Sequence, residues 1–199
     1  MKIFYVGELQ SVISNLQKLG VDISFNLDCY CNGIIATDTI PEAEIGLWKE
    51  YCSRYNIPLI IKGNQQYHYI GVNVLVLDET EKELFYKEHN ITTLQECKDR
   101  LRELQIHYLV IALTKEQIKQ QVQHNLPKSG NANLNITNEQ VAEARDILTA
   151  LVGYIYIKEG TLTTEAIQRA NTGAALSVVG FTGDDLKDFY MDIKFKGDK

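Results

Sequence analysis

The sequence predicts an α/β fold in which helices cover both faces of a mostly parallel sheet. Short apolar runs of strand type alternate along the chain with segments of helical periodicity, which is the pattern of a parallel sheet with covering helices. The chain has 199 residues, of which 45% are hydrophobic, so it can bury one core of ordinary size. It contains no internal repeat. We therefore expect a single domain over residues 1–199.

Local signals place the elements of the first part of the chain. A strand is expected at 2–6. The segment 9–19 carries apolar residues at helical spacing, and Gly20 follows it as a helix stop. A short buried strand at 34–37 precedes a helix at 42–55, which begins directly after a proline.

Further strands are expected in the middle of the chain at 58–61, 73–77 and 108–113. Thr93 with Glu96 three residues later forms the pattern of a capping box and starts a helix that runs to Leu104. A polar helix is expected at 115–123. The stretch 127–135 has the composition of a linker.

The C-terminal third is predicted to be helical. Thr137 and Gln140 have the spacing of a capping box, which starts a helix near Asn138 and carries it through Asp146 into an apolar run. A further helix is expected at 163–179. On this interpretation Asp146 is a polar residue inside an amphipathic helix, far from any helix N-terminus.

Composition excludes several classes of function. The net charge is −6 and the basic residues form no cluster, so no nucleic-acid interface is expected. No stretch is long enough to span a bilayer and no secretory signal is recognisable, which favours a cytoplasmic protein. The four cysteines lack paired CxxC spacing, and the four histidines are scattered. We therefore expect reduced thiols and no zinc site.

One stretch of motifs resembles a known family. Glu143, Ala144, Arg145 and Asp146 precede the apolar run, and a later helix contains Ala-Asn at 170–171 followed by alanines. This order resembles the ribokinase-like (PfkB) carbohydrate kinases, in which a Gly-Ala-Gly-Asp loop opens the corresponding helix. Here the Ala and the Asp remain and both glycines are replaced. The resemblance implies that Asp146 is the counterpart of the catalytic base.

Other segments are similar to the bacterial heptose-phosphate kinases, one branch of that family. Lys62-Gly63 follows a strand as in that branch, although the preceding Asp-Pro is absent. Asp78 and Glu81 resemble the family's Asn-x-x-Glu element, which helps to place magnesium and phosphate. Asp78 could instead simply cap the following helix, with the acids favoured by the helix dipole.

The nucleotide side of the resemblance rests on fewer residues. After the strand at 108–113, Thr114 stands where the family has a turn with two glycines that receives phosphates, and both glycines are absent. Asn171 and Gly173 match the family's adenine-side helix. The small residues of that helix also fit a purely structural role, because close helix packing requires them.

The resemblance implies two possible functions. In the first, the chain is a truncated ribokinase-like domain without the N-terminal lid, a pseudokinase that acts as a binding, regulatory or assembly subunit. In the second, it is a compact kinase that transfers the γ-phosphoryl group of ATP to a small sugar or sugar phosphate. Asp146 would then act as base, and Asp78 and Glu81 would position Mg²⁺. Because the glycine turns that approach phosphate are lost, we favour the first.

A protein partner is also expected. A domain that lacks a lid and N-terminal strands leaves an edge or a face that must be covered. The chain contains eleven tyrosines and one tryptophan, and tyrosine suits interaction surfaces because it is amphipathic and is ordered at low cost. We expect a homodimer or a complex with a homologous protein.

Overall fold

The fold is built on one parallel sheet. The computed structural model of the protein describes residues 1–27, 30–37, 41–63, 70–125 and 134–180. In these residues the sheet has six strands in the order β2-β1-β3-β4-β5-β6, and every neighbouring pair is parallel. The strands are β1 (Lys2–Val6), β2 (Asp22–Ser24), β3 (Gly33–Ala36), β4 (Leu59–Lys62), β5 (Val74–Leu77) and β6 (Tyr108–Ile111).

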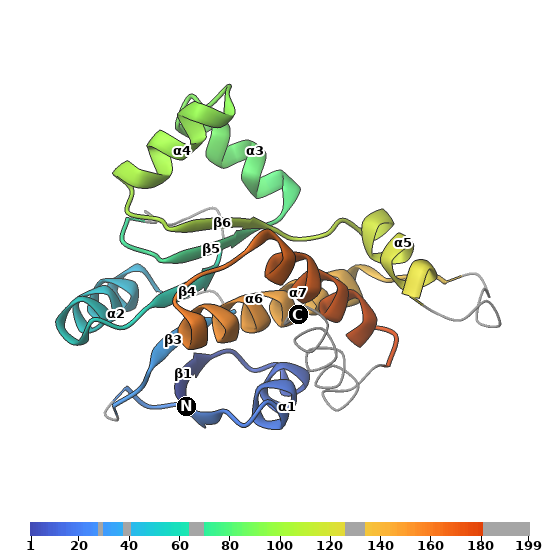
Figure 1. The fold of residues 1–199 in the computed structure, drawn as a ribbon, viewed down its shortest axis with the longest axis horizontal. Helices are drawn as coiled ribbons and strands as arrows, with labels where there is room; N and C mark the ends of the chain where they lie inside the picture. The colour runs from blue at the N-terminus through green and yellow to red at the C-terminus, as the bar shows by residue number, and fades with distance from the viewer. Residues whose placement is uncertain (28–29, 38–40, 64–69, 126–133, 181–199) are drawn as a thin grey trace, which may run out of the picture.

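Helices cover both faces of the sheet, so the α/β fold expected from the sequence is confirmed (Figure 1). On one face α1, α6 and α7 pack against the sheet, and on the other face α2, α3 and α4 do so. Helix α5 packs mainly on α7, beside the sheet. The helices are α1 (Gln10–Lys18), α2 (Glu42–Tyr55), α3 (Glu79–Glu88), α4 (Leu94–Glu103), α5 (Lys115–Asn125), α6 (Asn138–Glu159) and α7 (Thr164–Ser177).

The central strands are almost entirely apolar, with Lys62 at the end of β4 as the exception, because both of their faces are buried. In β4, for example, Ile60 belongs to the core under α6, whereas Leu59 and Ile61 belong to the core under α2. All four residues of β3 and of β5 are buried. The pleat thus divides each apolar run between two cores.

Helix α6 packs against the sheet and contains Arg145 and Asp146, two residues of the motif that resembles the kinase family. It begins with the expected capping box: Gln140 N donates to Thr137 Oγ1 at 3.2 Å, and Thr137 N donates to Gln140 Oε1 at 2.9 Å. It ends at Gly160, whose φ of 73° is the left-handed conformation that glycine adopts readily. It therefore continues unbroken through Arg145 and Asp146.

Most expected elements occur with small shifts of their ends. Four strands have ends that differ from expectation by one or two residues, and Lys62 belongs to its strand; the four are Gly33–Ala36, Leu59–Lys62, Val74–Leu77 and Tyr108–Ile111. The strand β2, with three residues, was not expected. Most of the expected linker at 127–135 lies outside the described residues. Among the residues described, no helix has both the length and the apolar composition of a membrane span.

Candidate functional site

Charged side chains meet at the carboxyl ends of β4 and β5, where open α/β sheets place their ligands. They come from the end of β4, from the start of α3 and from α6, which passes beneath this edge of the sheet. Three expected site residues, all acids, therefore lie close together, and two basic side chains pair with them. These residues are Lys62, Asp78, Glu81, Arg145 and Asp146.

The expected base, Asp146, forms an ion pair with the last residue of β4. Lys62 Nζ donates to Asp146 Oδ1 at 2.5 Å. Both side chains are largely buried, with 22% of Lys62 and 12% of Asp146 exposed. Because Asp146 lies beyond the first turn of α6, no free N–H groups of a helix N-terminus surround it. The position in mid-helix that the capping box predicts is confirmed.

The neighbouring residue Arg145 connects α6 to the expected metal ligands. Its Nη1 donates to Asp78 Oδ2 at 3.0 Å, and its Nη2 donates to Glu81 Oε2. Nη2 also donates to the backbone carbonyls of Gly63, at 2.8 Å, and Val76, at 3.3 Å. One guanidinium therefore holds two carboxylates and the ends of two strands.

Asp78 and Glu81 also cap helix α3. Glu81 N donates to Asp78 Oδ1 at 2.8 Å, and Asp78 N donates to Glu81 Oε2 at 3.0 Å, which completes a capping box. The capping interpretation that the sequence allowed is therefore confirmed. The other oxygen of Asp78 remains for Arg145, so the pair caps a helix and binds a cation at once.

Opposing electrostatic effects act on the pKa of the Glu81 carboxyl. Burial raises the pKa of Glu81, while the hydrogen bond from Asp78 N and the charge of Arg145 act in the opposite direction. The nearby charge of Asp78 adds to the rise of this pKa. Burial and the charge of Asp78 thus favour the protonated form of the Glu81 carboxyl, whereas Arg145 favours the ionised form.

The residues expected on the nucleotide side do not join this cluster. Thr114 opens α5: its Oγ1 accepts from Gln117 N at 3.3 Å, and its N–H donates to Gln117 Oε1 at 2.8 Å. Gly173 is buried within α7. Asn171 lines a hollow with Leu113 of the β6–α5 connection and Ala144 of α6.

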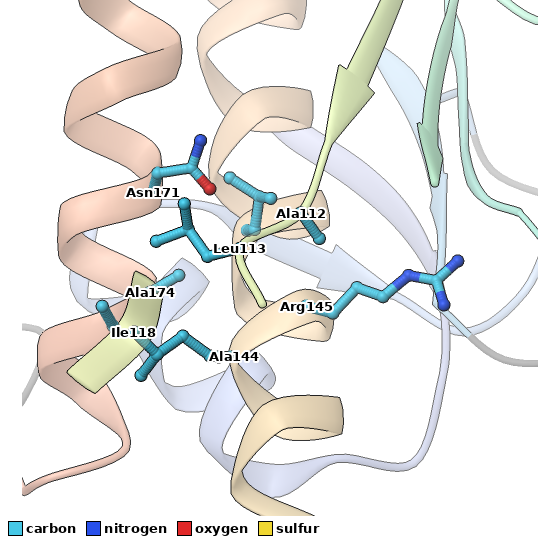
Figure 2. A pocket seen from close by; sticks show the side chains of 9 residues that line it. Ala112, Leu113, Ile118, Ala144, Arg145, Asn171 and Ala174 are labelled. Atoms are coloured by element: carbon cyan, nitrogen blue, oxygen red, sulfur yellow. The ribbon is translucent and has the colours of Figure 1, made fainter. Parts of the chain in front are cut away.

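The hollow beside Asn171 is small. Its free volume is about 10 Å³, far below the roughly 300–1,000 Å³ of common ligand pockets. Figure 2 shows the Asn171 amide at its α7 side, while the side chain of Arg145 extends away from it. Asn171 Oδ1 is buried and has no hydrogen-bond partner in the described residues.

The topological switch point of the sheet lies elsewhere, between β1 and β3. There Tyr5 Oη and Thr37 Oγ1 form a hydrogen bond of 2.8 Å. A Cβ added at Gly7 would lie 2.4 Å from each of these oxygens, so the space at the end of β1 is filled by the chain itself. The charged cluster at β4 and β5 is therefore the better candidate site.

Sequence reasoning missed the two cations of the site. It took Arg145 only as an obstacle to phosphate and Lys62 only as part of a motif. A signal existed, because Lys62 ends an otherwise apolar buried strand and an ionised side chain in such a place needs a partner. No group of three or more His, Cys, Asp or Glu side chains suited to a metal ion occurs among the residues that the structure describes.

The comparisons with known proteins add no relative. No model of a protein family matches the chain, and no curated protein matches it either. The geometry of the site and the resemblance in the sequence are therefore the two observations that bear on function.

Proposed function

We propose that this protein is a catalytically inactive relative of the PfkB-type carbohydrate kinases and acts as a binding, regulatory or assembly subunit in the cytoplasm. The observation that carries the proposal is the ion pair of Lys62 with Asp146. A general base must accept a proton from the attacking hydroxyl within hydrogen-bond reach. Asp146 instead receives an ammonium group at 2.5 Å and is largely buried.

The phosphate and nucleotide positions support the same proposal. Phosphoryl transfer depends on positioning and on donors that stabilise the developing charge. At Thr114 both the side chain and the backbone N–H bond to Gln117 within the first turn of α5. The hollow beside Asn171 is too small for a nucleoside. A nucleotide would therefore have to displace interactions that the protein already makes.

The proposed partner is a second copy of the chain or a homologous protein. Several large apolar side chains are exposed, among them Tyr30, Leu47 and Tyr55. A binding subunit needs such surface, because aromatic residues contribute most strongly to protein interfaces. Light scattering after gel filtration at micromolar concentration should give at least twice the mass of one chain. A strictly monomeric mass, with no heterologous partner recovered by cross-linking in cells, would count against an assembly role.

The second candidate is the compact kinase of a small sugar or sugar phosphate, with ATP and Mg²⁺ as cofactors. One observation favours it: the carboxylates of Asp78, Glu81 and Asp146 lie at one edge of the sheet, where a kinase would need them. If this function holds, Arg145→Gly should preserve or raise turnover by opening the site, and Asp146→Asn should abolish it.

Calorimetric titration of ATP and ADP, each with and without Mg²⁺, separates the two candidates. For the inactive subunit we expect no heat and no thermal stabilisation up to millimolar nucleotide. Mg²⁺-dependent binding at micromolar affinity, together with phosphotransfer that Asp146→Asn removes, would overturn the proposal in favour of the kinase. Lys82→Ala, which removes a surface cation of α3, serves as the matched control for nonspecific charge effects.

A further inference from the structure

The guanidinium of Arg145 sits among four oxygen atoms of the kind that bind hard cations. Two are carboxylate oxygens, of Asp78 and Glu81, and two are backbone carbonyl oxygens, of Gly63 and Val76. Carboxylates and backbone carbonyls are the ligands that Ca²⁺ and Mg²⁺ take in proteins. In this chain the cation that they hold is a side chain of α6.

A divalent cation does not fit the site as it stands. The resemblance implies Mg²⁺ near Asp78 and Glu81, yet both carboxylates already bind Arg145. Arginine stays protonated at every physiological pH, so it cannot release these oxygens by losing its charge. An ion placed between the two carboxylates would meet a fixed positive charge at contact distance.

We infer that Arg145 is a built-in replacement for the divalent cation, which closes this edge of the sheet to metal and fastens α6 to β4, β5 and α3. The inference deepens the proposed function and rests on it in one respect, that the Asp78–Glu81 pair is the counterpart of a metal-positioning element. It gives the two acids that follow β5 a cationic partner within the chain itself. The planar guanidinium fork reaches several acceptors at once, which a lysine cannot do.

Burial makes the replacement more than a surface ion pair. Only 14% of the Arg145 side chain and 11% of the Glu81 side chain are exposed, so the surrounding water screens the pair weakly. If the guanidinium is removed, the two carboxylates and two carbonyls face one another without a positive charge. A divalent cation should then become favourable at the same place.

The experiment compares the effect of cations on wild-type protein and on Arg145→Ala. Thermal unfolding is measured with EDTA and with millimolar Mg²⁺ or Mn²⁺. We expect no cation-dependent shift for the wild type, a lowered midpoint for Arg145→Ala, and recovery of part of that loss by Mn²⁺ or Mg²⁺. Arg145→Ala/Glu81→Gln should recover nothing. The matched control is Arg169→Ala, which removes an arginine paired with Glu165 within α7.

Direct binding of Mn²⁺, followed by electron paramagnetic resonance, tests the same point without unfolding. We expect Arg145→Ala to bind Mn²⁺ and the additional change Glu81→Gln to remove this binding. The wild type should bind Mn²⁺ at least tenfold more weakly than Arg145→Ala. If Arg145→Ala does not fold, Arg145→Gln retains hydrogen bonds without the charge and takes its place.

Two results would overturn the inference. One is Mn²⁺ binding or cation-dependent stabilisation of the wild type that Asp78→Asn removes. The other is a folded Arg145 variant that neither binds nor responds to the cations. The proposed function fails separately: nucleotide binding and turnover by a wild type that binds no Mn²⁺ would refute the inactive subunit and leave Arg145 as the internal cation.

Discussion

Lys62 and Asp146 form a short ion pair across 84 positions of the chain, with 2.5 Å between Nζ and Oδ1. The pair joins the end of β4 to a position in the middle of α6. The preceding residue of that helix, Arg145, makes the hydrogen bonds to Asp78, Glu81 and the strand ends. Two successive residues of one helix thus hold two neighbouring strands through opposite charges: Arg145 offers a cation and Asp146 an anion. This arrangement ties the carboxyl ends of β4 and β5 to α6 through side chains of the chain itself.

The Lys62–Asp146 pair should show a large coupling energy in a double-mutant cycle. Lys62→Met leaves a largely buried carboxylate without its cation and should cost about 3 kcal/mol, whereas Lys62→Met/Asp146→Asn should recover much of that loss. Urea unfolding of the wild type, the two single variants and the double variant measures the coupling energy, which should be about 1 kcal/mol or more.

The pair Lys82–Glu79 is a matched control for that cycle. It has the same N–O distance, 2.5 Å, but 29% and 48% of its side chains are exposed. Its coupling should stay below about 0.5 kcal/mol because water screens it and the long side chains lose entropy. Equal coupling in the two cycles would mean that burial does not strengthen the Lys62–Asp146 pair.

The stability lost in Arg145→Ala should depend on pH. Burial already raises the pKa of Glu81, and removal of the guanidinium raises it further. A carboxyl whose folded-state pKa is raised favours folding fully below its unfolded pKa, and this contribution is lost as pH rises through the folded pKa. The loss should therefore be about 3 kcal/mol near pH 7 and smaller near pH 5. Urea unfolding at both pH values measures it, and a loss that grows on acidification would refute this role of Glu81.

Substitutions at Asp78 should separate capping from ion pairing. Asp78→Asn keeps an oxygen that accepts from Glu81 N but loses the negative charge beside Arg145, and Asp78→Ala loses both. The difference in unfolding free energy between the two variants should be about 1 kcal/mol, the usual contribution of an N-cap.

Thr93→Ala is the reference for this comparison, because Thr93 caps α4 by the same geometry and α4 packs on the opposite face of the sheet from α6. The loss of unfolding free energy in Thr93→Ala should equal the difference in unfolding free energy between Asp78→Ala and Asp78→Asn. If Asp78→Asn alone costs as much as Asp78→Ala, the charge rather than the cap is what Asp78 contributes.

Two glycines in helices should respond to the same substitution with opposite signs. A Cβ at Gly153 of α6 would lie 2.7 Å from Ile35 Cδ1 and 3.4 Å from Ile60 Cγ2, whereas a Cβ at Gly46 of α2 would meet nothing within 4 Å. Gly153→Ala should cost about 1–3 kcal/mol by overpacking. Gly46→Ala should stabilise by about 0.5–1 kcal/mol through helix propensity. The denaturant midpoints of both variants, compared with the wild type, test these signs. A stabilised Gly153→Ala would show that the Ile35 side chain can move without cost to make room for the added methyl group.

The helices could be read from the sequence because their signals are local. The capping boxes at Thr93 and Thr137 join residues three apart, and both occur as predicted. The helix Glu42–Tyr55 also has the predicted ends. The strand β2 was missed because three residues, Asp22–Ser24, are too few to show a pattern, and pairing with β1 is what makes them a strand.

The sequence by itself determined the fold class, the order of the elements and the place of Asp146 inside a helix, because periodicity and capping act between residues at most four positions apart. Only the tertiary structure decided which charges meet. Glu81 and Arg145 are 64 positions apart, and their contact depends on the register of β4 and β5 and on the path of α6 beneath them. No local rule contains that information, because packing of the whole sheet sets it.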